Sequence, residues 1–214
     1  MTNSTDLFPG FEEEVIASTQ IPFCQVHNPP NMSLAQIKQY QPPIGWFIPA
    51  EQAQQAELKI NHNWQPLRLT FAEDTPNPRE VDGFLASHLR ICVLHTSQIE
   101  VQERAKKGWR YCGLAYEYGH LTEYGQLAQS DRHHFRLRTC YLVMFLDDNH
   151  QPIHSTPLKI GMNAGVGVAF ATELKQFRTE IETAYFQTVQ EPKKSLSDRA
   201  HALTVFDFQL RKKK

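Results

Sequence analysis

Two short stretches of this 214-residue chain combine cations with aromatic rings. Trp109-Arg110-Tyr111 is the first, and residues 132–138 are the second. Guanidinium groups pair with phosphates and aromatic rings stack on bases, so both ingredients of single-stranded nucleic-acid binding are present. The same rings also suit a hydrophobic core, which is the alternative interpretation. The candidate nucleic-acid-binding residues are Lys106, Lys107, Trp109, Arg110, Tyr111, Arg132, Phe135, Arg136 and Arg138.

The distribution of charge supports an anionic partner. The formal net charge is −1 and favours no class of partner by itself. Residues 104–138 nevertheless carry seven Lys or Arg against three acids, and residues 193–214 carry seven against two. Residues 1–20 carry four acids and no base. Such asymmetry is typical of a protein that turns one face toward an anion, although a solvated, charge-balanced surface is the alternative.

A glycine-bearing run, residues 161–167, is a second candidate for anion binding. It connects a predicted strand to a predicted helix, whose free N–H groups attract anions. The run lacks the Gly-Lys-Ser/Thr ending of a phosphate-binding P-loop, and its glycines do not have dinucleotide-binding spacing. Residues 162–169 also contain no cation. We therefore favour a structural connection between strand and helix.

Ligands for a metal gather at one place in the sequence. His150 and His154 follow Asp147 and Asp148, and a hairpin would bring the two imidazoles together. A metal-assisted hydrolase at this cluster is the weakest of the functions that we consider. Asp and Asn are also ordinary turn residues. We therefore expect no structural or catalytic metal and no cofactor.

The sequence shows no recognisable arrangement of a nucleophile with a general base, so we expect a protein that is not an enzyme. The cysteines are widely separated and form no Cys-x-x-Cys pair. Free cysteine behaves as a small apolar residue, and buried reduced thiols are the favoured interpretation. The four are Cys24, Cys92, Cys112 and Cys140.

The elements that must position these residues are mostly strands. Apolar alternation or short apolar runs predict strands within residues 21–27, 45–48, 67–71, 89–95, 99–102, 109–114, 134–146, 153–160 and 204–210. In the longest strand, Tyr141 and Phe135 share one face, whereas Arg136 and Arg138 share the other. Its first half is thus cationic on one face, and its second half is apolar on both. This pattern is typical of a central strand whose N-terminal end emerges at the surface.

An amphipathic helix is predicted near the C-terminus, and it must pack on a sheet. Its apolar stripe consists of Phe170, Leu174, Phe177, Ile181 and Ala184 or Tyr185, and we expect Phe177 to be almost fully buried. Pro49 is expected to begin a helix through residue 57, and Ser33 to cap another that ends before Gln41. Residues 73–80 predict a polar, proline-rich loop, and residues 116–129 show no clean period.

Many strands with few, separated helices predict an α+β fold. We expect one domain over residues 1–214, with an irregular entry over about residues 1–45 and a basic C-terminal tail. The core is expected to be an antiparallel sheet or a small OB-like barrel, with the C-terminal amphipathic helix packed on it. No apolar run approaches the roughly 20 residues of a membrane span, and no secretory signal begins the chain. We therefore expect a cytoplasmic protein with no membrane contact.

Three segments serve as motifs for a comparison with known families. They are the entry at residues 21–29, the strand at residues 141–147, and residues 157–160, which lead through a glycine-containing turn into Phe170 and a helix ending near Tyr185. Together they resemble an uncharacterised cyanobacterial family found on plasmids and mobile elements. The resemblance carries over no catalytic residue. It implies a replication, recombination or defence context.

The leading hypothesis is a non-enzymatic protein that binds nucleic acid, with single strands as the expected partner, or that assembles nucleoprotein. The alternative is a structural subunit that uses the same strands and the C-terminal tail to contact a protein partner or a second copy in a homo-oligomer. The two differ in what the cationic strands meet, namely phosphates or protein.

Overall fold

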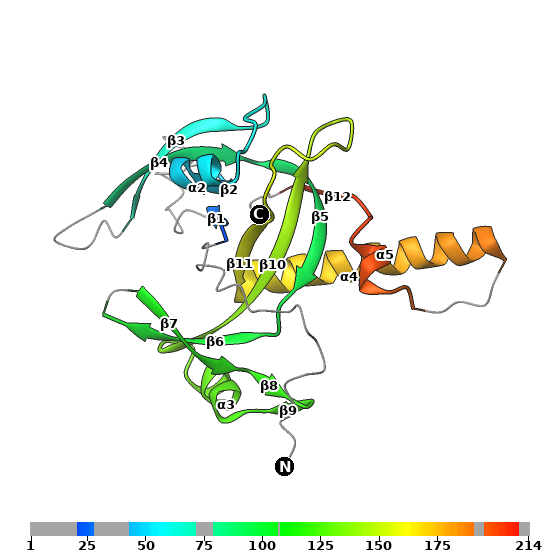
Figure 1. The fold of residues 1–214 in the computed structure, drawn as a ribbon. Helices are drawn as coiled ribbons and strands as arrows, with labels where there is room; N and C mark the ends of the chain where they lie inside the picture. Colours follow the sequence, from blue (N-terminus) through cyan, green and yellow to red (C-terminus); the bar gives the residue numbers. More distant parts are fainter. Residues whose placement is uncertain (1–20, 28–42, 72–78, 107, 191–194, 210–214) are drawn as a thin grey trace, which may run out of the picture.

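The protein folds around one open, mixed sheet of ten strands, shown in Figure 1. The computed structural model describes residues 21–27, 43–71, 79–106, 108–190 and 195–209. Eight strands lie side by side in the order β12 (Phe206–Gln209), β5 (His88–Thr96), β10 (Phe135–Leu146), β11 (Leu158–Asn163), β1 (Phe23–His27), β2 (Gly45–Pro49), β4 (Arg79–Ala86) and β3 (Gln65–Phe71). Neighbours on this path are antiparallel except β1 and β11, which run parallel. The predicted α+β class is confirmed, and the sheet does not close into a barrel.

Strand β10 joins two groups of elements. Its first half pairs with β6 (Glu100–Ala105), whose other edge pairs with β7 (Gly108–Leu114). Its second half pairs with β5, and residues 138–143 pair with β11. Tyr141, Val143 and Phe145 alternate along the second half and are buried in the main core. The prediction of a central strand with a cationic first half is confirmed.

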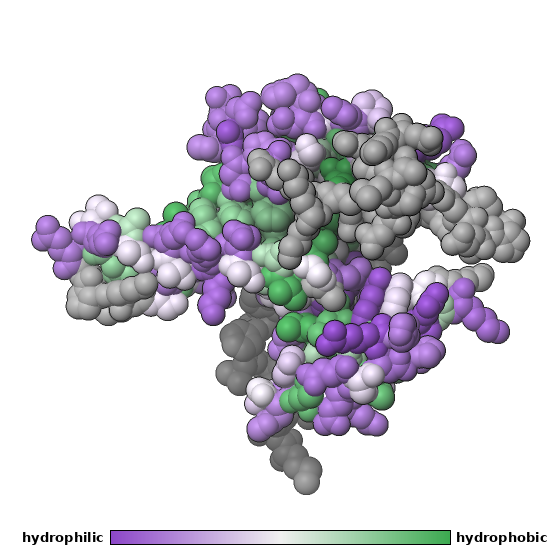
Figure 2. All heavy atoms as spheres, turned by 180° about the vertical axis from the view of Figure 1, so that it is seen from behind, coloured by the Kyte–Doolittle hydropathy of each residue, from purple (hydrophilic) through white to green (hydrophobic). Residues whose placement is uncertain are grey.

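Helix α4 (Ala164–Val189) packs on β10 and β11, as predicted. Phe170 is fully buried, with its ring centroid 4.7 Å from that of Tyr141 and 5.0 Å from that of Phe208. The prediction for Phe177 is wrong, because this side chain is only half-buried beside Phe206. Tyr185, which the sequence also assigns to the apolar stripe, is exposed. Figure 1 shows the reason, since the second half of α4 projects beyond the sheet, and its end is mostly hydrophilic in Figure 2.

The short helix α5 (Asp198–His201) lies against α4 through one carboxylate. Glu182 accepts a hydrogen bond from the backbone N–H of Leu196 at 3.0 Å, and its Oε1 lies 3.1 Å from Nε2 of His201. The Leu196 N–H lowers the pKa of Glu182 most, and the contact with His201 lowers it further. These contacts hold the segment that places β12 beside β5.

A smaller group of elements extends the first half of β10 (Figure 1). It consists of β6, β7, β8 (Tyr116–Glu117), β9 (His120–Leu121) and α3 (Glu123–Ser130). Its satellite core contains the buried residues Val101, Ala115 and Ala128. Gly125 lets α3 approach closely, because a methyl group there would overlap the Ala115 carbonyl. Residues 116–129 show no period because strands of two residues are too short to display one.

Three further predictions need correction. Strand β4 begins at Arg79, inside the predicted loop, so residues 79 and 80 are extended and paired with β3. The glycine-bearing run connects strand to helix as predicted, but it contains no separate turn, because β11 continues through Asn163 and α4 begins at the next residue. Strand β1 is not part of an irregular entry but an internal strand between β11 and β2. The Ser33 helix, residues 72–78 and, within the basic C-terminal segment, residues 193–194 and 210–214 lie outside the described residues.

The remaining helix starts one residue later and ends two residues earlier than predicted. Helix α2 (Ala50–Gln55) starts directly after Pro49, which ends β2 and occupies the N-cap position. Ala53 of α2 is buried in the main core. In the parts of the chain that the structure describes, no helix combines the length and apolar character needed to cross a membrane.

Candidate functional site

Cationic and aromatic side chains meet on one face of β6, β7 and the first half of β10. Side chains alternate along a strand, and directly opposed partners share a face. Gln102 is opposed by Tyr111 on one side and by Arg136 on the other, and Arg104 is opposed by Trp109. We call this surface the basic-aromatic face, and its residues are Gln102, Arg104, Trp109, Tyr111, Arg136 and Arg138, with Glu100 opposite Arg138 at its edge.

The opposite face of the same strands belongs to the satellite core. Val101 is fully buried there, with Leu137 and Phe135 packed beside it under α3. Arg110 lies on this side too, with its Nη2 2.6 Å from Oε2 of Glu103. Phe135 is therefore a core ring, and Arg110 already has an anionic partner.

Arg136 is held in place by two neighbours on the basic-aromatic face. Its guanidinium carbon lies 4.3 Å from the ring centroid of Trp109, a cation–π contact. Its Nε donates a hydrogen bond of 2.9 Å to Oε1 of Gln102, which is buried. Burial, together with the nearby charge of Arg138, lowers the pKa of Arg136 to about 10. The side chain is thus fixed in position and remains cationic at neutral pH.

Arg138 extends toward the neighbouring strand β11. Its guanidinium lies over Gly161, where any added methyl group would overlap it. Glu100 opposes Arg138 on β6, but the two are not within ion-pair distance. Among the residues that the structure describes, neither Arg136 nor Arg138 forms an ion pair with a carboxylate. Two guanidinium groups and one neighbouring carboxylate that pairs with neither leave this site with a net positive charge.

Both arginines open into a cavity of about 560 Å³, which we call the arginine-lined cavity. Its walls come from β10, β11, β1 and the first turn of α4. The lining residues are Gln25, Val26, Arg136, Arg138, Gly161, Met162, Asn163, Gly165 and Val166. The contribution of β11 and α4 to this cavity was not predicted from the sequence. The register of β10 with β11, which brings Gly161 to Arg138, cannot be read from either segment alone.

The other predicted binding residues lie apart from this cavity. Arg132 is exposed in the turn before β10, and Lys106 is exposed in the turn between β6 and β7. Lys107 lies outside the described residues. Trp109 and Tyr111 expose 37% and 55% of their surface, so both rings are accessible on the basic-aromatic face. Of the nine candidates, the structure thus brings together Trp109, Tyr111, Arg136 and Arg138.

His150 and His154 follow β10, and their surroundings indicate a structural role. His154 is buried, and its Nε2 accepts the Phe145 N–H at 2.7 Å. Its Nδ1 lies 2.7 Å from the Thr156 carbonyl oxygen, so Nδ1 carries the proton. Burial lowers the pKa of His154, which favours the neutral ring. His150 is exposed, with a left-handed φ of 60° in the turn. Both nitrogens of His154 are thus occupied by backbone groups.

Acid and nucleophile side chains also gather where α5 meets α4. Ser195 Oγ donates to Oε1 of Glu182 at 3.3 Å, and Nε2 of His201 approaches the same oxygen. In a hydrolytic triad the histidine stands between the hydroxyl and the acid. Here the carboxylate is the central group, so the arrangement does not activate Ser195 as a nucleophile.

The four cysteines are free thiols. Cys24 and Cys140 are buried, whereas Cys92 and Cys112 are half-buried. Burial raises the pKa of each thiol above its usual value. The prediction of buried, unpaired cysteines is confirmed for Cys24 and Cys140, whereas Cys92 and Cys112 are unpaired but only half-buried. The raised pKa values disfavour the reactive thiolate.

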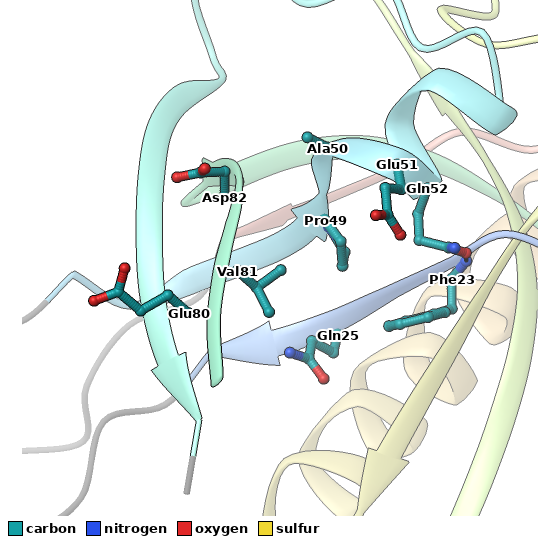
Figure 3. Close-up of a pocket in the computed structure, with 9 residues that line it drawn as sticks. All are labelled: Phe23, Gln25, Pro49, Ala50, Glu51, Gln52, Glu80, Val81 and Asp82. Carbon is teal, nitrogen blue, oxygen red and sulfur yellow. Dashed lines mark hydrogen bonds between the residues drawn. The ribbon is translucent and has the colours of Figure 1, made fainter. Parts of the chain in front are cut away.

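A second cavity, of about 600 Å³, lies beside the first and has the opposite character. Figure 3 shows Phe23, Pro49 and Val81 pointing toward one another, whereas Asp82 points away from them. Asp82 pairs with Arg68 at 2.6 Å. The cavity is apolar at its centre, and its nearest charges are acids, which do not attract phosphate.

Comparisons with known proteins give one match. No curated protein and no solved structure shows significant similarity to the chain. A family model described as Domain of unknown function (DUF5895) matches residues 18–214, which include every strand and helix described above. The chain therefore belongs to the DUF5895 family.

Proposed function

We propose that the protein is a non-enzymatic, cytoplasmic single-stranded nucleic-acid-binding protein that uses the basic-aromatic face. One observation carries the proposal: the Arg136 guanidinium is fixed on the Trp109 ring, with Arg138 beside it and no carboxylate paired to either in the described ranges. Phosphates would neutralise the two cations, and the exposed rings would stack on bases.

Preorganisation favours this use of the face. Gln102 and Trp109 already immobilise Arg136, so binding costs less side-chain entropy than it would for a free arginine. Burial and then the charge of Arg138 disfavour the charged form of Arg136, and a bound anion would offset both effects. Both effects favour a phosphate over a neutral ligand.

The resemblance to a family of plasmids and mobile elements supports a replication, recombination or defence context. Single strands arise in each of these processes, which fits a protein that reads backbone charge and base stacking. Family membership adds no function of its own.

The test is the salt dependence of binding to single-stranded DNA, single-stranded RNA and duplex DNA, measured by fluorescence anisotropy. Each phosphate contact contributes about −0.7 to the slope of log affinity on log salt for a single strand. The double substitution Arg136→Ala and Arg138→Ala should weaken binding and flatten this slope. Trp109→Ala should weaken binding with almost no change in slope, because stacking releases no counterions.

Arg110→Ala is the matched control, since it removes the same charge from the face covered by α3. It should leave both affinity and slope nearly unchanged. Absence of binding to any single strand at low salt would contradict the proposal.

A protein-binding subunit is the second candidate. The projecting end of α4 exposes Tyr185 and Val189, and the turn after α5 exposes Leu203. These apolar side chains favour contact with a protein. Sedimentation of the wild type and of a Tyr185→Ser, Leu203→Ser variant tests this candidate, which requires self-association that the substitutions abolish.

A further inference from the structure

The arginine-lined cavity has more than one kind of anion-binding group. Arg136 and Arg138 supply two guanidinium groups from β10. Gly165 belongs to the first turn of α4, where backbone N–H groups lack intrahelical partners. The Asn163 side chain makes no capping hydrogen bond with these groups. Charged side chains of β10 and the first turn of α4 therefore line the same cavity.

The local charges leave this cavity positive. Glu100 is the acid nearest in register to Arg138, and its Oε2 lies 3.8 Å from the Cys140 thiol. Lys159 adds a further positive charge that acts on the same thiol. None of the described residues that line the cavity is an acid. The positive end of the α4 dipole adds to the charge of the two arginines.

Two glycines provide the space that a ligand needs. Gly161 makes room for the Arg138 guanidinium on the surface of β11. A side chain at Gly165 would meet no atom of the described residues within 4 Å, so these residues leave the entrance beside α4 open. The volume of about 560 Å³ lies in the usual range of small-molecule sites, roughly 300–1,000 Å³.

We propose that this cavity binds a phosphate monoester, the 5′-phosphorylated end of a single strand, through Arg136, Arg138 and the first turn of α4. A monoester carries about two negative charges at neutral pH, which match the two guanidinium groups, whereas a bridging phosphodiester carries one. Trp109 contacts Arg136, so a base next to the terminal phosphate can stack on the same face. This inference rests on the proposed function and specifies one subsite of it.

The test compares short oligonucleotides that differ only at the 5′ end, phosphate or hydroxyl, with the fluorescent label at the 3′ end. At physiological salt, the 5′-phosphorylated strand should bind about tenfold more tightly, because it gains charge-assisted hydrogen bonds. Arg138→Gln should remove this advantage. Arg110→Gln, which neutralises an arginine on the opposite face, should retain it.

A second variant tests the subsite without the risk that the substitution itself unfolds the protein. Gly165→Asp places a carboxylate in open space at the cavity, and an acid in the first turn of a helix stabilises that helix. The variant should melt no earlier than the wild type and should lose the tenfold advantage. A folded Gly165→Asp protein that still prefers the 5′-phosphate overturns the cavity as the subsite.

The outcomes separate the two proposals. Equal, salt-dependent binding of both strands overturns the monoester subsite and leaves the proposed function standing. Absence of binding to both strands, combined with calorimetric binding of a nucleoside 5′-monophosphate that Arg138→Gln abolishes, supports the cavity and overturns the nucleic-acid function.

Discussion

The two halves of β10 share one backbone but differ in their surroundings. In the second half, Tyr141, Val143 and Phe145 are buried in the main core. In the first half, Arg136 and Arg138 lie on the face turned away from α3. The comparison shows that one end of a strand can contribute to the hydrophobic core while the other end presents candidate binding residues.

The cationic face of the first half is not arranged for stability. Burial and the neighbouring Arg138 lower the pKa of Arg136, so its surroundings disfavour the charged form. Removing a core ring should therefore cost much free energy of unfolding, whereas removing an arginine should cost little. Four substitutions test this contrast.

Phe170→Ala should have the largest effect. Phe170 is fully buried and contacts the rings of Tyr141 and Phe208, so the substitution removes transfer free energy and leaves a cavity. The expected loss is about 3–5 kcal/mol in the free energy of unfolding, measured by urea denaturation. Val168→Ala on the exposed side of α4 is the control and should change it by less than about 0.5 kcal/mol. Equal losses for the two variants would show that α4 does not pack on the sheet as described.

His154→Leu should come next, at about 1–3 kcal/mol near pH 7.5, because it leaves the buried Phe145 N–H without an acceptor. The effect should depend on pH. Burial lowers the pKa of His154, so its contribution is fully present above the unfolded value near 6.5 and is lost as the pH falls through the lower, folded value. The difference in unfolding free energy between wild type and variant should therefore shrink between pH 7.5 and pH 5. A difference that grows over this range contradicts a buried neutral imidazole.

Phe177→Ala should cost less than Phe170→Ala. Phe177 is half-buried where α4 leaves the sheet and contacts Phe206 along one side. About half of a full side-chain burial corresponds to roughly 1–2 kcal/mol. The thermal midpoints of the two variants provide the check. A Phe177→Ala protein that melts as early as the Phe170→Ala protein would mean that the projecting part of α4 is covered in solution.

Arg138→Gln should have the smallest effect on stability. It removes the charge that lowers the pKa of Arg136, and no ion pair with a described carboxylate is lost. The free energy of unfolding should stay within about 0.5 kcal/mol of the wild type or rise slightly. Arg110→Gln, which breaks an exposed ion pair with Glu103, should cost about 0–1 kcal/mol. A loss above 1 kcal/mol for Arg138→Gln would assign that arginine a structural role instead.

The sequence predicts what depends on one element. The alternation of Tyr141, Val143 and Phe145 indicates the buried face of β10, and the spacing of Phe170 and Leu174 indicates the buried side of α4. Both patterns are periodic, so they need no knowledge of neighbouring strands. The separation of Arg136 and Arg138 from that buried face follows from the same period.

The sequence does not predict what depends on several elements. The contact between Arg138 and Gly161 requires the register of β10 with β11, and no local pattern encodes it. Burial of Phe135 and neutralisation of Arg110 likewise arise from α3 and β6. The position of Phe177 depends on where the sheet ends beneath α4, which helical spacing alone does not reveal.

The parallel pairing of β1 with β11 has a consequence for folding. Phe23 lies opposite Lys159, so the centre of the sheet joins segments from distant parts of the chain. Such pairings close large loops and are slow to form. During synthesis, β1 and β2 leave the ribosome long before β11 is made. One edge of β1 therefore stays unpaired until β11 emerges. We therefore expect the middle of the sheet to assemble last. A chain interrupted before residue 158 would keep that edge open to association with other strands.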